Sequence, residues 1–331
     1  VAKWKAEGRY EQEVKELDEF FKRTGHPRAP RFYIMKWLTD YITEYGIDGY
    51  RVDTVKHTEE FVWQEFKKEC DAAFEEYKKK NPNKVMDQND FYLVGEVYNY
   101  GISGGQFFDF GDKKVNYFDE AFQSLINFEF KWNAKQMMMA DMHHKYDSIL
   151  QYQLKDYGVL NYLSSHDDGQ PFDPTREKTI DAGTILLLSP GASQVYYGDE
   201  TARSLVIEGT NGDATLRSFM NWEDLDSNKN AKKTLTHYQK LGQFRVNHPA
   251  VGAGKHTAIS DNNQYVFSRI LNDDKIIVGL GFENDKKEIS VKGVFKNGET
   301  LLDAYSGYEV TVEDDKIIIN SGYSIVLLEN K

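Results

Sequence analysis

Length, composition and charge narrow the class of protein. The chain has 331 residues, 40 % of them apolar, which suits one large domain followed by a small one. A net charge of −12 argues against nucleic acid as a partner, because its phosphates would be repelled. No apolar stretch approaches the roughly 18 residues of a membrane span. The single cysteine, Cys70, excludes an internal disulfide, and its helically spaced apolar neighbours predict a core position.

From about residue 30 to residue 247, short apolar runs alternate with amphipathic helical stretches. Strands are predicted at 47–52, 91–97, 125–128, 159–163 and 194–197. Helices are predicted at 32–45, 58–80, 137–146, 180–188 and 231–246. This alternation predicts parallel strands joined by crossover helices.

Two folds have that rhythm, a doubly wound open sheet and a (β/α)8 barrel, and periodicity alone does not separate them. Acidic and histidine residues follow at least three different strands, at their C-terminal ends, which is where barrels place their sites. An open sheet binds around one crevice, and its phosphate-binding glycine fingerprint is missing here. The barrel is therefore the favoured prediction.

After about residue 250 the pattern changes to short β-rich runs separated by turn residues. Such runs lie at 265–270, 275–280, 288–291, 309–312, 317–319 and 324–328. The dipeptide Asn297-Gly298 is a strong hairpin signal. These features predict a small antiparallel β domain, in the form of a sandwich.

The first candidate catalytic residue is Asp53, which ends the strand Gly-Tyr-Arg-Val-Asp. Alternation along a strand places Arg51 and Asp53 on the same face. An arginine beside a carboxylate keeps it ionised, as a nucleophile requires. A structural ion pair at a strand end explains this segment equally well.

The second candidate is Glu96, at the end of the apolar run Leu-Val-Gly-Glu-Val. A glutamate flanked by glycine and valine has little polar surrounding, and partial burial would raise its pKa toward the value that a general acid needs. On its own this signal is weak.

The third candidate is Asp167, after the run Asn-Tyr-Leu-Ser-Ser-His. His166 could donate a hydrogen bond to a substrate hydroxyl, and Asp167 could stabilise a positively charged transition state. A metal site of His166, Asp167 and Asp168 is the competing interpretation, ranked lower because no matching histidine or cysteine cluster occurs elsewhere. The pair His143-His144 is expected on a solvated helix surface.

Retaining glycosidases use two carboxyl groups about 5–5.5 Å apart. The segments at 49–57, 95–97 and 165–167 resemble three of the four conserved regions of the α-amylase family of glycoside hydrolases. Their order and their spacing of 43 and 71 residues between the acidic positions also fit. Residues 190–200 and 217–222 resemble the segments at and after the eighth barrel strand. The nearest match is the periplasmic-type bacterial subgroup, and the resemblance runs from about residue 15 to residue 250.

This resemblance implies a role for each candidate residue. It implies that Asp53 is the nucleophile, Glu96 the general acid/base and Asp167 the stabiliser of the transition state. The residues expected to bind or orient the substrate are Arg51, Lys56, His57, His166 and Tyr98. The resemblance also implies a structural Ca²⁺ ion with the backbone carbonyl of His57 as one ligand, because calcium takes several oxygen ligands.

The resemblance covers only part of the family's architecture. The family's first conserved region and barrel strands one to three have no counterpart, so the five predicted strands correspond to about strands 4–8. Five strands cannot close a barrel. We therefore expect an upstream N-terminal segment, and domains at 1–30 (end of a protruding loop domain and linker), 31–249 (C-terminal part of the catalytic barrel) and 250–331 (antiparallel β domain).

The function implied by the resemblance is retaining endo-hydrolysis of α-1,4-glucans such as starch, glycogen or maltodextrins. An α-glucanotransferase with the same carboxylates and a non-catalytic glucan-binding or partner protein are the alternatives. The expected location, by resemblance, is the periplasm or outside the cell, although no export signal is visible in this chain.

Overall fold

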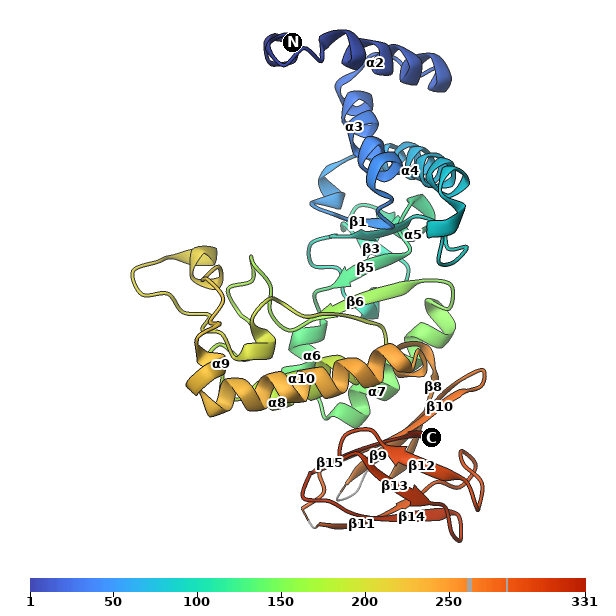
Figure 1. Ribbon diagram of the computed structural model, residues 1–331, viewed down its shortest axis with the longest axis vertical. Helices are drawn as coiled ribbons and strands as arrows, with labels where there is room; N and C mark the ends of the chain where they lie inside the picture. The colour runs from blue at the N-terminus through green and yellow to red at the C-terminus, as the bar shows by residue number, and fades with distance from the viewer. Residues whose placement is uncertain (261–263, 284) are drawn as a thin grey trace. The chain divides into compact units, whose positions relative to one another are not determined.

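The computed structural model describes residues 1–260, 264–283 and 285–331. The chain divides into two compact units, one of residues 1–98 and 110–124 and the other of residues 99–109 and 125–331. This division does not follow the domain boundaries predicted at 30/31 and 249/250, which remain predictions. Figure 1 labels the helices and strands of both units.

The first unit is built from helices around a pair of parallel strands. Its elements are α1 (Ala2–Ala6), α2 (Tyr10–Thr24), α3 (Pro30–Tyr45), β1 (Gly49–Val52), η1 (Val55–His57), α4 (Glu60–Lys80), η2 (Pro82–Lys84), β2 (Tyr92–Gly95), β4 (Lys114–Val115) and α5 (Tyr117–Glu120). Strand β1 pairs with β2 in parallel register, with Gly49 opposite Tyr92.

Local sequence explains the limits of α3, the helix that leads into β1. Pro30 stands in the first turn, where its missing N–H costs nothing. Gly46 ends the helix at φ 68°, a left-handed conformation that glycine adopts without steric cost. Helix α3 packs against α4, and the side chain of Cys70 on α4 is fully buried, as predicted. Burial raises the pKa of its thiol, which makes a reactive role unfavourable.

The second unit begins with further alternating strands and helices. Its elements up to residue 253 are η3 (Ile102–Gly104), β3 (Phe108–Asp109), β5 (Ser124–Asn127), α6 (Phe130–Gln136), α7 (Met139–Ser148), the π-helical turn η4 (Ile149–Gln153), β6 (Gly158–Tyr162), α8 (Thr179–Leu187), β7 (Ala192–Gln194), η5 (Asp199–Thr201), η6 (Gly212–Leu216), α9 (Asp224–Ser227), α10 (Lys229–Asn247) and α11 (Ala250–Ala253). Strands β6 and β7 are parallel. The spatial order β5-β6-β7 follows the sequence, without the reversal of a doubly wound sheet.

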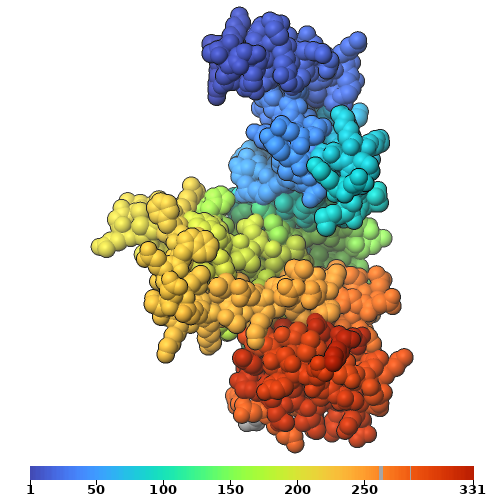
Figure 2. All heavy atoms as spheres, in the orientation of Figure 1, coloured from blue at the N-terminus to red at the C-terminus, as the bar shows by residue number. Residues whose placement is uncertain are grey.

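Helix α10 connects this part of the second unit to the β strands that follow. The side chain of Asn228 caps it by accepting hydrogen bonds from the backbone N–H groups of Asn230 and Ala231. Its buried face, which includes Leu241 and Phe244, shares one hydrophobic cluster with α8 and with strands β9, β10 and β15. Figures 1 and 2 show α10 lying across the top of the β domain.

The β domain consists of antiparallel strands in two sheets around a second apolar cluster. Its strands are β8 (Lys255–Ser260), β9 (Tyr265–Leu271), β10 (Asp274–Leu280), β11 (Lys286–Ser290), β12 (Thr300–Asp303), β13 (Tyr308–Thr311), β14 (Lys316–Asn320) and β15 (Ile325–Asn330). The order β13-β12-β15-β10-β9-β8 makes the larger sheet, and β11 pairs with β14. The buried cluster includes Val266, Ile277, Ile289, Phe295 and Val326.

Two local predictions in the second unit need correction. The helix predicted over 137–146 is α7, which begins two residues later because the backbone is extended at Met137 and Met138, and a separate helix, α6, precedes it. The dipeptide Asn297-Gly298 forms a turn with Gly298 at φ 89°, but β11 and β12 on either side of it do not pair with each other. The two residues determine the turn itself, whereas the pairing partners of β11 and β12 are strands that come later in the chain.

The prediction of a solvated histidine pair is also wrong for His143. Its side chain is fully buried, with Nδ1 at 2.9 Å from the Tyr265 hydroxyl and at 3.0 Å from Arg269 Nη2. Burial, reinforced by the charge of Arg269, holds the pKa of His143 well below its usual value. Both neighbours come from β9, more than a hundred residues later in the chain, so local polarity gave no sign of this burial.

No helix in the part of the chain that the structure describes has the length and apolarity that a membrane crossing requires.

Candidate active site

The C-terminal end of β1 carries the predicted nucleophile and its arginine. Arg51 and Asp53 lie on the same face, as strand alternation predicts, and Arg51 Nη1 donates to Asp53 Oδ1 at 2.5 Å. The Asp53 side chain is 65 % exposed, so this carboxylate is open to a ligand while one of its oxygens is held. The second guanidinium nitrogen of Arg51 lies 3.4 Å from Glu96 Oε2.

The neighbouring strand end carries the predicted acid/base. The backbone ladder of β1 and β2 continues past both strands, because Glu96 N–H donates to the Val52 carbonyl and Val55 N–H donates to the Glu96 carbonyl. This register brings the Glu96 side chain beside Asp53. Glu96 is 7 % exposed, and burial raises the pKa of its carboxyl, with the Asp53 charge acting in the same direction. The Thr54 N–H and Arg51 act in the opposite direction.

Thr54 links the two carboxylates through an unusual backbone conformation. Its φ is 49°, in the left-handed region, which is costly for a β-branched residue. The conformation points the Thr54 N–H at Glu96 Oε2, at a distance of 3.0 Å. Strain of this kind persists where the surrounding structure fixes it, and it clusters at functional sites.

Three further predicted residues lie near this strand end. Lys56 Nζ donates to the Tyr98 carbonyl at 3.1 Å and lies 5.1 Å from the centre of the Tyr98 ring. Tyr98 is 54 % exposed, which leaves its ring available for stacking. His57 is the last residue of η1, and its side chain is exposed.

The segment after β6 carries the third predicted carboxylate. Ser165 Oγ donates to Asp167 Oδ1 at 3.0 Å, and His166 Nε2 lies 3.3 Å from Asp167 Oδ2. The side chains of His166 and Asp167 are 48 % and 39 % exposed. Arg217 Nε donates to the His166 carbonyl at 2.9 Å, a tether that strand and helix patterns did not reveal.

The geometry around Asp168 speaks against the metal site considered for this segment. The Asp168 carboxylate accepts a hydrogen bond from the buried Lys131 ammonium and another, of 3.2 Å, from the Tyr162 hydroxyl. A lysine therefore already provides the positive charge beside this carboxylate. Among the residues that the structure describes, no group of three or more histidine, cysteine, aspartate or glutamate side chains is placed to hold a metal ion.

Calcium has one predicted ligand in this chain, the His57 carbonyl, whereas a protein calcium site takes six to eight oxygen ligands. The described residues do not gather further carboxylates for such a site.

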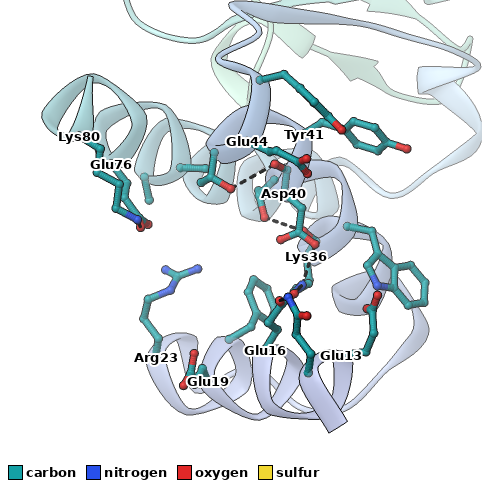
Figure 3. Close-up of a pocket in the computed structure, with 18 of the residues that line it drawn as sticks. Glu13, Glu16, Glu19, Arg23, Lys36, Asp40, Tyr41, Glu44, Glu76 and Lys80 are labelled. Atoms are coloured by element: carbon teal, nitrogen blue, oxygen red, sulfur yellow. Dashed lines mark hydrogen bonds and ion pairs between the residues drawn. The ribbon is translucent and has the colours of Figure 1, made fainter. Parts of the chain in front are cut away.

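A pocket of the first unit lies away from the predicted site residues. Its volume is about 970 Å³, and it is lined by residues of α2, α3 and α4 (Figure 3). Lys36, the buried cation at its floor, pairs with Glu16 at 2.9 Å and with Asp40 at 2.6 Å. Several of its charged lining groups thus pair with one another, and the predicted site residues do not line it.

Carboxylates at the C-terminal ends of parallel strands, one buried and one held by an arginine, are the arrangement of a glycoside hydrolase site. The family model of the alpha-amylase catalytic domain matches residues 26–254. The chain belongs to the α-amylase family of glycoside hydrolases.

Comparison with individual proteins agrees with this assignment. The chain is 39 % identical over 252 residues to the periplasmic alpha-amylase of Escherichia coli (strain K12), covering 76 % of this chain and 35 % of that protein. It is 23 % identical over 318 residues to a cyclomaltodextrinase of Geobacillus thermopakistaniensis (strain MAS1), covering 90 % of this chain and 47 % of the relative. The chain thus spans a third to a half of the length of these relatives.

A solved structure with a similar fold is the α-amylase of Anoxybacillus, with a TM-score of 0.62 and 21 % identity. The match covers 91 % of this chain and 63 % of that one. It confirms the predicted fold class, the C-terminal part of a (β/α)8 barrel followed by an antiparallel β domain.

Proposed function

We propose that the protein to which this chain belongs is a retaining endo-acting α-amylase, which hydrolyses α-1,4-glucosidic bonds in starch, glycogen or maltodextrins. The observation that carries the proposal is the group of Arg51, Asp53 and Glu96. It contains an exposed carboxylate held by a guanidinium beside a buried carboxyl whose pKa is raised. These two states suit a nucleophile and a general acid at the same pH.

Each carboxyl group has a distinct step in the proposed reaction. Glu96 in its protonated form gives its proton to the glycosidic oxygen as the bond to the leaving sugar breaks. Asp53 attacks the anomeric carbon and forms a glycosyl ester. Glu96, now ionised, takes a proton from water, and this water hydrolyses the ester with net retention of configuration. Asp167 stabilises the positive charge of the transition state.

The remaining predicted residues bind or orient in this proposal. Arg51 holds Asp53 ionised and fixes the oxygen that does not attack. Lys56 and His166 donate hydrogen bonds to sugar hydroxyls, His57 is a further sugar contact, and the exposed ring of Tyr98 stacks on a sugar face.

We also propose that activity needs a further polypeptide segment beyond this chain. Strand β1 pairs with β2 along one edge, and no strand within the described residues pairs with its other edge. On α3, the aromatic side chains of Trp37, Tyr41 and Tyr45 are 39 %, 55 % and 62 % exposed. A free parallel edge and exposed aromatic rings are features that folded proteins cover. We expect the 331-residue chain alone to release no reducing sugar from starch, and release by the chain alone would contradict this part of the proposal.

We also propose a structural Ca²⁺ ion, most of whose ligands come from polypeptide outside this chain. The His57 carbonyl would supply one oxygen, and the other ligands would come from the further segment. The expected result is that the longer protein retains calcium after gel filtration, as measured by mass spectrometry of the metal, and that the 331-residue chain does not. For location, we propose the periplasm or the outside of the cell, which rests on the likeness to a periplasmic relative.

The primary test is hydrolysis of starch by the full-length protein and by its Asp53→Asn variant. The wild type should release α-configured maltodextrins, and the variant should lose activity by a factor on the order of 10⁴ or more, because no other group can form the ester. Transfer of glucosyl units to added maltose in place of water would identify a glucanotransferase. Binding of glucan without product would favour a non-catalytic role.

A further inference from the structure

The partly exposed pair His166 and Asp167 is attached to the interior of the second unit through Ser164, two residues before His166. The Ser164 side chain is 3 % exposed, and its hydroxyl donates a hydrogen bond to Asp199 Oδ2. Asp199 begins η5, after β7, and is 4 % exposed. A buried carboxylate from a different strand end therefore anchors the start of the segment that carries Asp167.

The Asp199 carboxylate is itself held from the opposite side. Arg176 Nη2 donates to Asp199 Oδ1 at 2.7 Å, and Arg176 Nε donates to the Arg203 carbonyl at 2.6 Å. Arg203 is 1 % exposed, and its guanidinium lies 4.0 Å from the centre of the Tyr197 ring. Both oxygens of Asp199 thus have partners, and the arginine that holds one of them is fixed by a second contact.

The path from Ser164 to the reacting residue is short. The next residue, Ser165, donates to Asp167, and Arg217 holds the His166 carbonyl from outside the segment. At the far side of the same turn, the Phe172 N–H donates to the Leu163 carbonyl at 2.8 Å. These contacts hold the chain around Asp167 from several sides, and a displacement of about 1 Å in a catalytic group can cost on the order of 10²-fold in rate.

We infer that Asp199, oriented by Arg176, is a positioning residue which fixes the His166-Asp167 segment through the Ser164 hydroxyl. The inference rests on the proposed function, because it assigns Asp199 a role in the reaction of Asp167. Asp199 does not touch the substrate in this scheme. A buried ion pair that served stability alone would lower the amount of folded protein without changing the rate of the remaining fraction.

The kinetic test compares Ser164→Ala, Asp199→Asn and the double variant in the full-length protein. Asp199→Asn should lower kcat by about 10- to 100-fold with KM within about threefold, because transition-state positioning is lost and substrate binding is retained. Ser164→Ala should lower kcat in the same direction. The double variant should lose no more kcat than Asp199→Asn, because both substitutions break the same hydrogen bond between Ser164 and Asp199. Multiplying effects, or a kcat per folded molecule equal to that of the wild type, would overturn the inference.

The matched control is Asp303→Asn in the β domain. Asp303 is also buried and also accepts a hydrogen bond from a serine hydroxyl, that of Ser306, but it is the last residue of β12. This variant should lower Tm to a similar degree as Asp199→Asn and leave kcat per folded molecule unchanged. Equal losses of kcat in both variants would show that Asp199 contributes only to the stability of the fold.

A second measurement separates this inference from the proposed function. In protein with ¹³C-labelled histidine, the ring signal of His166, assigned with His166→Gln, should shift or broaden in Asp199→Asn and stay in place in Asp303→Asn. This result needs no activity. If the wild type fails to act on α-glucans while the His166 signal still responds to Asp199→Asn, the proposed function fails and the positioning link stands. A His166 signal unchanged in Asp199→Asn overturns the link.

Discussion

Two groups of carboxylates at strand ends of this protein lie in contrasting settings. At the ends of β1 and β2, Asp53 and Glu96 are held by Arg51 and by the Thr54 N–H, and Glu96 is buried. After the end of β6, the Asp167 side chain is 39 % exposed, and it lies beside a serine hydroxyl and a histidine ring. The first setting raises the pKa of one buried carboxyl beside an exposed carboxylate, whereas the second holds one carboxylate in place.

This contrast indicates what each carboxyl group contributes to the proposed reaction. Burial raises the pKa of Glu96, which suits a group that carries a proton, whereas Asp53 is exposed and paired with Arg51. Asp167 needs only to remain charged and in place, and the buried contacts of Ser164 supply the placement. Substitutions in the two settings should therefore differ in how large the loss of kcat is and in how the loss depends on the substrate and on pH.

The largest difference is expected for Glu96→Gln. Loss of the proton donor should lower kcat on maltooligosaccharides by about 10²–10⁴-fold. An aryl glycoside with an acidic leaving group needs no proton, so its release should suffer much less in the same variant. The measurement is the ratio of the two rates. Glu69→Gln is the control, because Glu69 is a buried glutamate paired with Arg23 and lies on α4. Equal losses on both substrates would mean that Glu96 is not the acid.

A smaller loss is expected for Asp167→Asn, on the order of 10²–10³-fold in kcat. The substitution removes a stabilising charge and no proton donor, so the loss should be similar for natural and activated substrates. Steady-state kinetics with both substrates test this. The comparison variant is Asp168→Asn, whose carboxylate is already paired with Lys131. A larger loss of kcat in Asp168→Asn than in Asp167→Asn would show that Asp168, and not Asp167, stabilises the transition state.

The smallest expected effect is a change in the pH dependence of activity in Arg51→Met. It is the most specific test of the contact between Arg51 and Glu96. Activity falls with rising pH as Glu96 loses its proton. Burial raises the pKa of Glu96 and Arg51 acts against this, so removal of Arg51 should raise that pKa further. The basic limb of kcat/KM should then move to higher pH.

Profiles of kcat/KM against pH for wild type and variant measure this shift. Arg23→Met serves as the control, because Arg23 pairs with the buried Glu69 and not with a predicted site residue. A basic limb that stays in place in Arg51→Met would show that another group sets it.

Some of the site could be predicted because its signals are local. Strand alternation places Arg51 and Asp53 on one face, and this holds in the structure. The scarcity of polar residues around Glu96 predicted its burial, which is also found. The helix end at Gly46 and the buried Cys70 follow from neighbouring residues in the same way.

Other features escaped prediction because they join distant segments. The burial of His143 depends on Tyr265 and Arg269, and the strands beside Asn297-Gly298 pair elsewhere. The anchoring role of Asp199 had no local signal, since Ser164 lies 35 residues away and Arg176 lies 23 residues away.

The sequence by itself determined the strand-helix order, the antiparallel β domain and the carboxylates at the strand ends. These follow from the spacing of apolar residues and from short motifs, which act within a few positions along the chain. Only the tertiary structure decided which carboxyl is buried beside which arginine, which histidine is covered, and which aspartate holds the segment of Asp167. Burial and hydrogen bonding of a side chain depend on the surfaces that fold against it, and those surfaces come from residues far away in the sequence.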